Sequence, residues 1–128
     1  MKNKDFYVDG FVLVIQNKNL SAYKKMAQWA GKIWKKHGAL DYKECIQDDI
    51  NPKTMGMKIL TFSKLTKAKK NETIVFSYIV YKSRKHRDEV NTKVMKDPVM
   101  NDPKYKDKPM PFDMKRMSYG GFKTIVSE

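Results

Sequence analysis

Tyr42 and Glu44 lie two positions apart in a segment of strand-like composition, so their side chains share one face of that strand. Inside a cavity, the Glu44 carboxylate has the chemistry of a general base, with Tyr42 or Tyr119 donating a hydrogen bond to a developing oxyanion. The structural interpretation, which we favour, is a cross-strand ion pair of Glu44 with a basic neighbour such as Arg116.

Asp9 presents the same choice in a more apolar strand. It lies among Tyr7, Phe11 and Leu13, where a buried carboxylate is costly unless it is paired. We expect a partner such as Arg116, a backbone amide or a ligand, and we favour structural pairing.

His86 lies in the expected first turn of a helix, where unpaired backbone amides attract anions. Lys82, Arg84 and Arg87 are close in the sequence, so the functional interpretation is a carboxylate or phosphate site. The alternative, which we favour, is a solvated helix start whose following acidic residues complement the helix dipole.

Other patterns that carry chemistry are sparse. His37 and His86 are far apart, and the sequence contains no His-x-x-His, Cys-x-x-Cys or acidic calcium-loop pattern, which predicts no bound metal. It contains no Walker or dinucleotide glycine pattern, so we expect no organic cofactor. Cys45 is expected to be an unreactive strand thiol.

The first half of the chain predicts a strand, a helix and a second strand. The first strand covers residues 6–15 and is apolar on both faces. Asn19 or Ser21 is expected to cap the helix, and Gly38 to end it. The second strand covers residues 39–47.

The second half repeats this order. The sequence predicts a strand over residues 73–81, a helix from the Ser83 cap to about residue 97, and a strand over residues 115–126. Within the last strand, Gly120 and Gly121 indicate a bulge, which we favour, or the close approach of another backbone or a ligand.

Two strand–helix–strand units joined by a connector over residues 48–72 predict an α+β fold of the ferredoxin-like kind. We expect a single domain over residues 1–128, with a four-stranded antiparallel sheet and both helices on one face. The other face would expose large apolar side chains, which monomers seldom do. We therefore expect a homodimer in which two sheets meet face to face.

Composition limits the partners and the compartment. The 128 residues include 27 lysines and arginines against 14 acidic residues, and the resulting net charge of +13 favours anionic partners. The single cysteine and the lack of a long apolar stretch predict a cytoplasmic protein that does not associate with membranes.

The strings YVDGFV (7–12), HGALDYKEC (37–45), VFSYIVYKSRKHRDEVNTKVMKDP (75–98) and MPFDMKRMSYGGF (110–122) carry a resemblance to a known family. They resemble the bacterial YbaA-like domains of unknown function, DUF1428, over nearly the whole chain. The resemblance implies a dimeric α/β barrel, in a superfamily that also contains cofactor-free monooxygenases, small isomerases and haem enzymes. Such a fold does not decide the function.

Two functional hypotheses follow, and the sequence leaves open whether the protein is an enzyme. In the first, a homodimeric barrel binds, or transforms without a cofactor, a small polar, anionic or aromatic molecule between sheet and helices. Its candidate ligand-binding residues are Asp9, Tyr42, Glu44, Lys82, Arg84, His86, Arg116 and Tyr119. The alternative is a nucleic-acid or polyanion-binding protein. We do not favour it, because the basic residues are scattered along the chain and the aromatic residues lie in strands that look buried.

Overall fold

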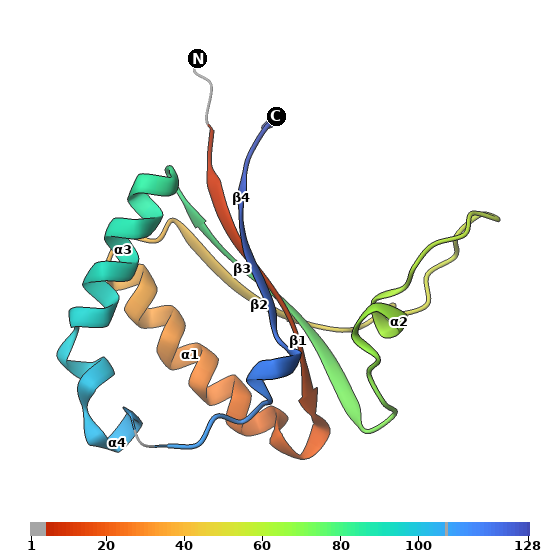
Figure 1. The fold of residues 1–128 in the computed structure, drawn as a ribbon, viewed down its shortest axis with the longest axis horizontal. Coiled ribbons are helices and arrows are strands. Elements are labelled where there is room, and N and C mark those ends of the chain that lie inside the picture. The colour runs from red at the N-terminus through yellow and green to blue at the C-terminus, as the bar shows by residue number, and fades with distance from the viewer. Residues whose placement is uncertain (1–4, 107) are drawn as a thin grey trace.

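A four-stranded sheet is the centre of the structure. The structure is a computed structural model that describes residues 5–106 and 108–128. Four antiparallel strands lie in the order β2-β3-β1-β4 (Figure 1). Their bounds are β1 Tyr7–Gln16, β2 Asp41–Ile46, β3 Glu72–Tyr81 and β4 Ser118–Lys123. This arrangement confirms the ferredoxin-like α+β fold that the two strand–helix–strand repeats predicted.

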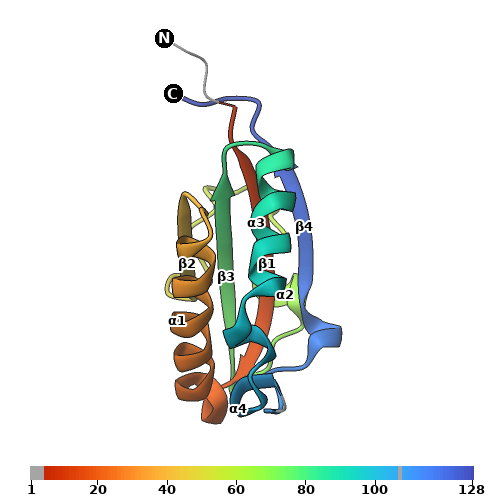
Figure 2. The same ribbon diagram turned by 90° about the vertical axis from the view of Figure 1, so that its left-hand side faces the viewer.

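Both long helices cover one face of the sheet. In Figure 2, α1 (Leu20–Lys36) lies in front of β2 and α3 (Arg84–Lys96) lies in front of β1. Two short helices are α2 (Phe62–Thr66) and α4 (Pro103–Lys106). Short 3-10 turns cover Asn17–Asn19, Pro98–Asn101 and Met114–Arg116. No helix among the described residues combines the length and the apolar character needed to cross a membrane.

The helix ends follow the expected signals with one exception. The Ser83 hydroxyl accepts a hydrogen bond from the His86 amide at 3.0 Å and so caps α3. Gly38 follows α1 with φ of +113°, a conformation that glycine adopts without steric cost. Asn19 occupies the N-cap position of α1, but its side chain makes no capping hydrogen bond within the described structure.

The core lies between the helices and the sheet. One cluster joins Ile79 and Tyr81 of β3 to Val90 and Val94 of α3. A second cluster joins β1 and β3 to α1 through Leu13, Ile15, Tyr23, Ala27 and Val75. These apolar contacts fix α1 and α3 on the sheet, because burial of aliphatic and aromatic surface is the dominant favourable contribution to folding.

The opposite face of the sheet, the open face, is covered only in part. Its residues include Phe76 on the inner strand β3 and Phe122 on β4, whose exposed fractions are 47% and 63%. Towards one end Val14 and Ile74 are buried, and α2 contacts β3 on this side (Figure 1). The sheet itself is open, with β2 and β4 as its edges, so the described chain does not form a closed barrel.

The two adjacent glycines of β4 have a different role from the expected bulge. The β1–β4 register continues unbroken through Gly10↔Gly120 and Asp9↔Gly121, so the bulge prediction is wrong. A Cβ atom on Gly121 would lie 2.2 Å from the Tyr7 hydroxyl oxygen. Gly121 therefore makes room for the Tyr7 ring on the helix side of the sheet.

Candidate functional site

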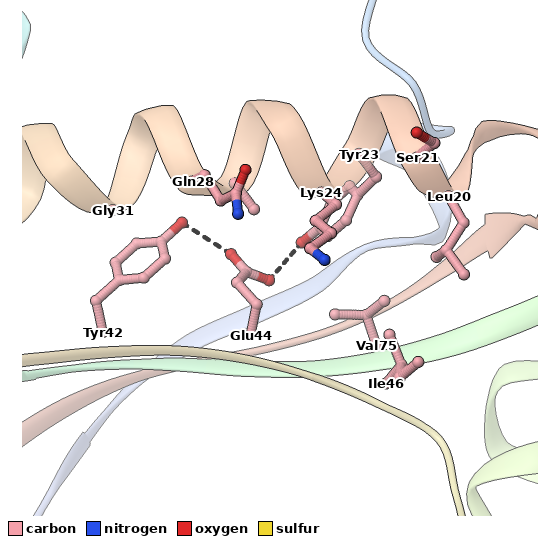
Figure 3. Close-up of a pocket in the computed structure, with 11 residues that line it drawn as sticks. Leu20, Ser21, Tyr23, Lys24, Gln28, Gly31, Tyr42, Glu44, Ile46 and Val75 are labelled. Atoms are coloured by element: carbon pink, nitrogen blue, oxygen red, sulfur yellow. Dashed lines mark hydrogen bonds between the residues drawn. The ribbon is translucent and has the colours of Figure 1, made fainter.

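A pocket of about 620 Å³ lies between α1 and the edge strand β2 (Figure 3). Its walls are mainly apolar and include Leu20, Ala27, Ile46 and Val75. The volume lies within the range of about 300–1,000 Å³ that is usual for small-molecule sites. The pocket is therefore large enough to hold a small organic molecule.

The Glu44 carboxylate lies inside this pocket between two tyrosines. The Tyr23 hydroxyl donates to Oε1 of Glu44 at 2.6 Å, and the Tyr42 hydroxyl donates to Oε2 at 2.8 Å (Figure 3). Tyr42 and Glu44 share the helix-facing side of β2, as their spacing predicted, whereas Tyr23 comes from α1. Each carboxylate oxygen is thus held by one phenol.

The protonation of the two phenols is set by their surroundings. Burial, and next the Glu44 carboxylate, raise the pKa of both Tyr23 and Tyr42 well above the ordinary value of 10.0. Both side chains therefore remain protonated donors at physiological pH, and Glu44 acts as the acceptor of the group.

Gly31 of α1 allows the Tyr42 ring to approach the helix closely. A Cβ atom at this position would lie 3.0 Å from Cδ1 and 3.1 Å from Cε1 of Tyr42, which is tighter than ordinary van der Waals contact. The small residue thus permits the ring orientation that brings the Tyr42 hydroxyl to Glu44.

The expected ion pair of Glu44 with Arg116 is not formed, and the sheet order explains why. Arg116 precedes β4, which lies at the opposite edge of the sheet from β2. It contacts Glu72 instead, with Nη1 2.6 Å from Oε2, and it also donates to the Thr66 carbonyl. This pair ties the end of the connector to the segment before β4. The hydrogen bond from Arg116 also lowers the pKa of Glu72.

Asp9 is buried and paired, but with Arg87 rather than Arg116. Nη1 of Arg87 lies 2.7 Å from Oδ1 of Asp9 and also donates to the Tyr119 hydroxyl at 3.0 Å. The guanidinium lies over the Tyr7 ring at 5.1 Å, and Phe11 stacks on Tyr119. Burial raises the pKa of Asp9, and Arg87 opposes this rise. The arrangement has the character of a structural ion pair between α3 and β1.

Tyr119 is therefore separated from Glu44 by the width of the sheet. It lies on β4 and bonds Arg87, whereas Glu44 lies on β2. The suggestion that Tyr119 donates to an oxyanion beside Glu44 is wrong, because the strand order places the two residues on opposite edges.

The basic residues around the start of α3 do not join the pocket. Nδ1 of His86 accepts a hydrogen bond from the Lys82 amide at 2.9 Å, so the ring is tied to the backbone before the helix. Lys82 and Arg84 are exposed. A ligand role for these three residues stays a prediction.

Tyr23 is the site residue that the sequence analysis missed. Its helical spacing with the apolar residues Leu20, Met26 and Ala27 is typical of a core position, and Tyr23 is buried. A tyrosine on the apolar stripe of a helix nevertheless needs a partner for its hydroxyl, and that need was the available signal.

Comparisons with known proteins place the chain in a family. Residues 6–114 match the family described as "Protein of unknown function (DUF1428)". The chain is 43% identical over 122 residues to the "Uncharacterized protein YbaA" of Escherichia coli (strain K12), a match that covers 95% of this chain and 98% of that protein. The protein of the same name from Shigella flexneri gives the same identity and coverage, again 43%, 95% and 98%.

A solved structure supports the fold. A dimeric ferredoxin-like protein from an uncultured marine organism matches with a TM-score of 0.50 at 15% sequence identity, and the match covers 98% of each chain. At this identity the likeness concerns the fold alone. The family match and the identity to the YbaA proteins show that the chain belongs to the DUF1428 family.

Proposed function

We propose that this protein is a homodimer that binds a small molecule in the pocket between α1 and β2. The observation that carries the proposal is the Glu44 carboxylate, which two tyrosine hydroxyls hold inside a largely apolar pocket of about 620 Å³. A few polar groups that converge within an apolar cavity are typical of ligand sites.

The charged residues of the pocket limit the class of ligand. Among the described residues, the lining holds one acidic residue, Glu44, and one basic residue, the exposed Lys24 of α1 (Figure 3). The ion pairs of the described residues include none with Glu44, although the chain carries a net charge of +13. Both carboxylate oxygens keep further acceptor capacity beyond the two tyrosine bonds. We therefore expect a ligand with an apolar body and one cationic or hydrogen-bond-donating group, such as a primary amine.

The geometry favours binding over catalysis. Proton abstraction by Glu44 would require a donor for the developing oxyanion close to the same carboxylate. Tyr23 and Tyr42 are the phenols within reach, and each already donates to Glu44 at 2.6 and 2.8 Å. Either phenol would have to give up that bond before it stabilised a negative charge on a substrate.

The open face supports the homodimer. Phe76 and Phe122 are large apolar side chains with 47% and 63% exposure on the side of the sheet without long helices. The ferredoxin-like protein of similar fold is described as dimeric. Two such faces packed about 10 Å apart would remove these side chains from water.

Three related probes test the ligand class. Binding of phenethylamine, 2-phenylethanol and phenylacetate is measured by ligand-observed NMR under the same buffer conditions. We expect the amine to bind most tightly and the acid least, because Glu44 attracts a cation and repels an anion. A charge-assisted hydrogen bond to Glu44 should make the amine bind about tenfold more tightly than the alcohol. The variant Glu44→Gln should abolish this preference.

Two tryptophan variants locate the binding. Gln28 lies on the exposed part of the pocket lining, so Gln28→Trp should block the entrance without disturbing the core. Ala22 is exposed on α1 outside the lining, and Ala22→Trp is the matched control that should bind like the wild type. Equal binding of all three probes, or amine binding that Gln28→Trp leaves unchanged, would contradict the proposal.

A further inference from the structure

The first part of the connector projects away from the body of the molecule. Residues 48–61, called the arm, leave the end of β2 and extend on the side of the open face (Figure 1). Most residues of the arm are exposed, and they return to the sheet through α2 and the start of β3. The arm and the open face therefore lie on the same side of the sheet.

The tip of the arm is a tight turn with an unusual residue in it. The Met57 amide donates to the Thr54 carbonyl at 3.0 Å, and Met55 and Gly56 between them have φ of 53° and 82°. A left-handed conformation is unfavourable for methionine, and glycine or asparagine is the usual residue there. Met55 is nonetheless 92% exposed, so neither local backbone preference nor burial within this chain explains an apolar side chain at the tip.

The returning half of the arm is rich in exposed apolar side chains. Met57 and Ile59 flank Lys58, and Leu60 follows them. The three apolar residues are exposed by 61%, 50% and 65%. Large apolar side chains exposed together in this way are typical of a surface that packs against another protein.

We propose that the arm docks on a second copy of this chain and clasps the dimer that forms through the open face. This inference rests on the homodimer of the proposed function and adds the segment that holds it. A body stacked on the open face lies beside the arm, because both are on one side of the sheet. In a twofold arrangement the same two surfaces are used in both directions, so each arm meets the other copy.

The size of the open face supports this occupant. With strands about 4.8 Å apart and a rise of about 3.3 Å per residue, four strands paired over six residues present roughly 400 Å². A stable interface buries about 800 Å² per partner, so the sheet face supplies about half of that area. The exposed apolar residues of the arm form the adjoining surface that supplies more.

The reach of the arm is also sufficient. The outgoing half of the arm bends at residues 48–51, but the five residues 57–61 of the returning half contain no bend. Five residues span at most roughly 17 Å, whereas two sheets packed face to face lie about 10 Å apart. The arm is therefore long enough to pass the sheet of the second copy.

The test measures the dimer dissociation constant by sedimentation velocity over a range of protein concentrations. In the variant Met55→Asn/Met57→Gln, asparagine suits the left-handed tip and both apolar side chains are lost. We expect the fold to be retained by circular dichroism and the dissociation constant to rise at least tenfold. The matched control is Met95→Gln, because Met95 is an exposed methionine on α3, on the other side of the sheet. We expect this control to lie within twofold of the wild type.

A third variant separates this inference from the dimer itself. Phe76→Glu places a charge on the open face and should dissociate the dimer whether or not the arm takes part. If Phe76→Glu dissociates the dimer and the arm variant matches the wild type, the arm inference is wrong and the dimer stands. If the wild type is monomeric at all concentrations, both are wrong.

Discussion

Gly121 and Gly120 are adjacent residues of β4 on opposite faces of the sheet, and alanine should destabilise the fold at Gly121 but not at Gly120. A Cβ atom on Gly121 would lie 2.2 Å from the hydroxyl oxygen and 2.8 Å from Cζ of Tyr7. The ring cannot move away freely, because the Arg87 guanidinium lies over it at 5.1 Å. At Gly120 the nearest atoms belong to the Phe122 ring at 3.6 and 3.7 Å, which is ordinary contact.

The magnitude follows from overpacking. Forcing an extra methyl group into a packed site costs about 1–3 kcal/mol, and loss of the cation–π contact adds about 0.5–1 kcal/mol. Replacing glycine reduces the entropy of the unfolded chain and returns about 0.4–1 kcal/mol. We expect Gly121→Ala to lower the free energy of unfolding by about 2 kcal/mol and Gly120→Ala to leave it unchanged or raise it by up to about 1 kcal/mol.

The assay is urea unfolding followed by circular dichroism at one fixed protein concentration, because association also stabilises the folded state. The variant Tyr7→Leu in the Gly121→Ala background is the rescue, and we expect it to cost less than the sum of the two single changes. Equal stabilities of Gly120→Ala and Gly121→Ala would refute the assignment of these two residues to opposite faces and the placement of the Tyr7 ring.

Three further predictions concern the groups that hold the helices. Ser83→Ala removes the cap on the His86 amide and should lower the free energy of unfolding by about 1 kcal/mol in the same urea assay. Arg87→Leu leaves Asp9 buried without its partner and should cost about 3 kcal/mol, with part of this recovered when Asp9→Asn is added; an additive double variant would argue against the pair. Hydrogen bonds from the His37 imidazole and the Val99 amide lower the pKa of Asp97 from 3.8 to about 2. The contribution of Asp97 to stability is therefore present above about pH 4 and is lost as the pH falls towards about 2. The melting temperatures of wild type and Asp97→Asn should therefore differ at pH 6 and converge near pH 2, and a constant difference would contradict this linkage.

The fold was predictable because local signals and periodicity agreed. The Ser83 cap and Gly38 mark helix ends, and apolar residues on both sides of the central strands require cover on two faces. The position of the arm was not predictable, because turn composition at residues 48–61 shows that regular structure ends but gives no direction in space.

The candidate site was predictable only within one strand. The spacing of Tyr42 and Glu44 places both side chains on one face, since side chains alternate in any strand. The partners across the fold required the strand order: Arg116 was a reasonable partner for Asp9 or Glu44 by charge alone, yet Arg87 and the phenol of Tyr23 are the groups that the topology brings there. Charge and residue type do not encode which edge of the sheet a segment joins.

The edge strand β2 belongs to two surfaces at once. Tyr42 and Glu44 point to the pocket, and the alternate residues Lys43 and Cys45 point to the open face. On that face Lys43 is paired with Tyr78 of β3, and Cys45 is paired with Phe76. If self-association stabilises this six-residue strand, ligand binding and dimerisation are coupled through it. By thermodynamic linkage, each then changes the affinity of the protein for the other by the same factor. Titrations performed at dilute and at concentrated protein would then yield different apparent affinities for the same compound.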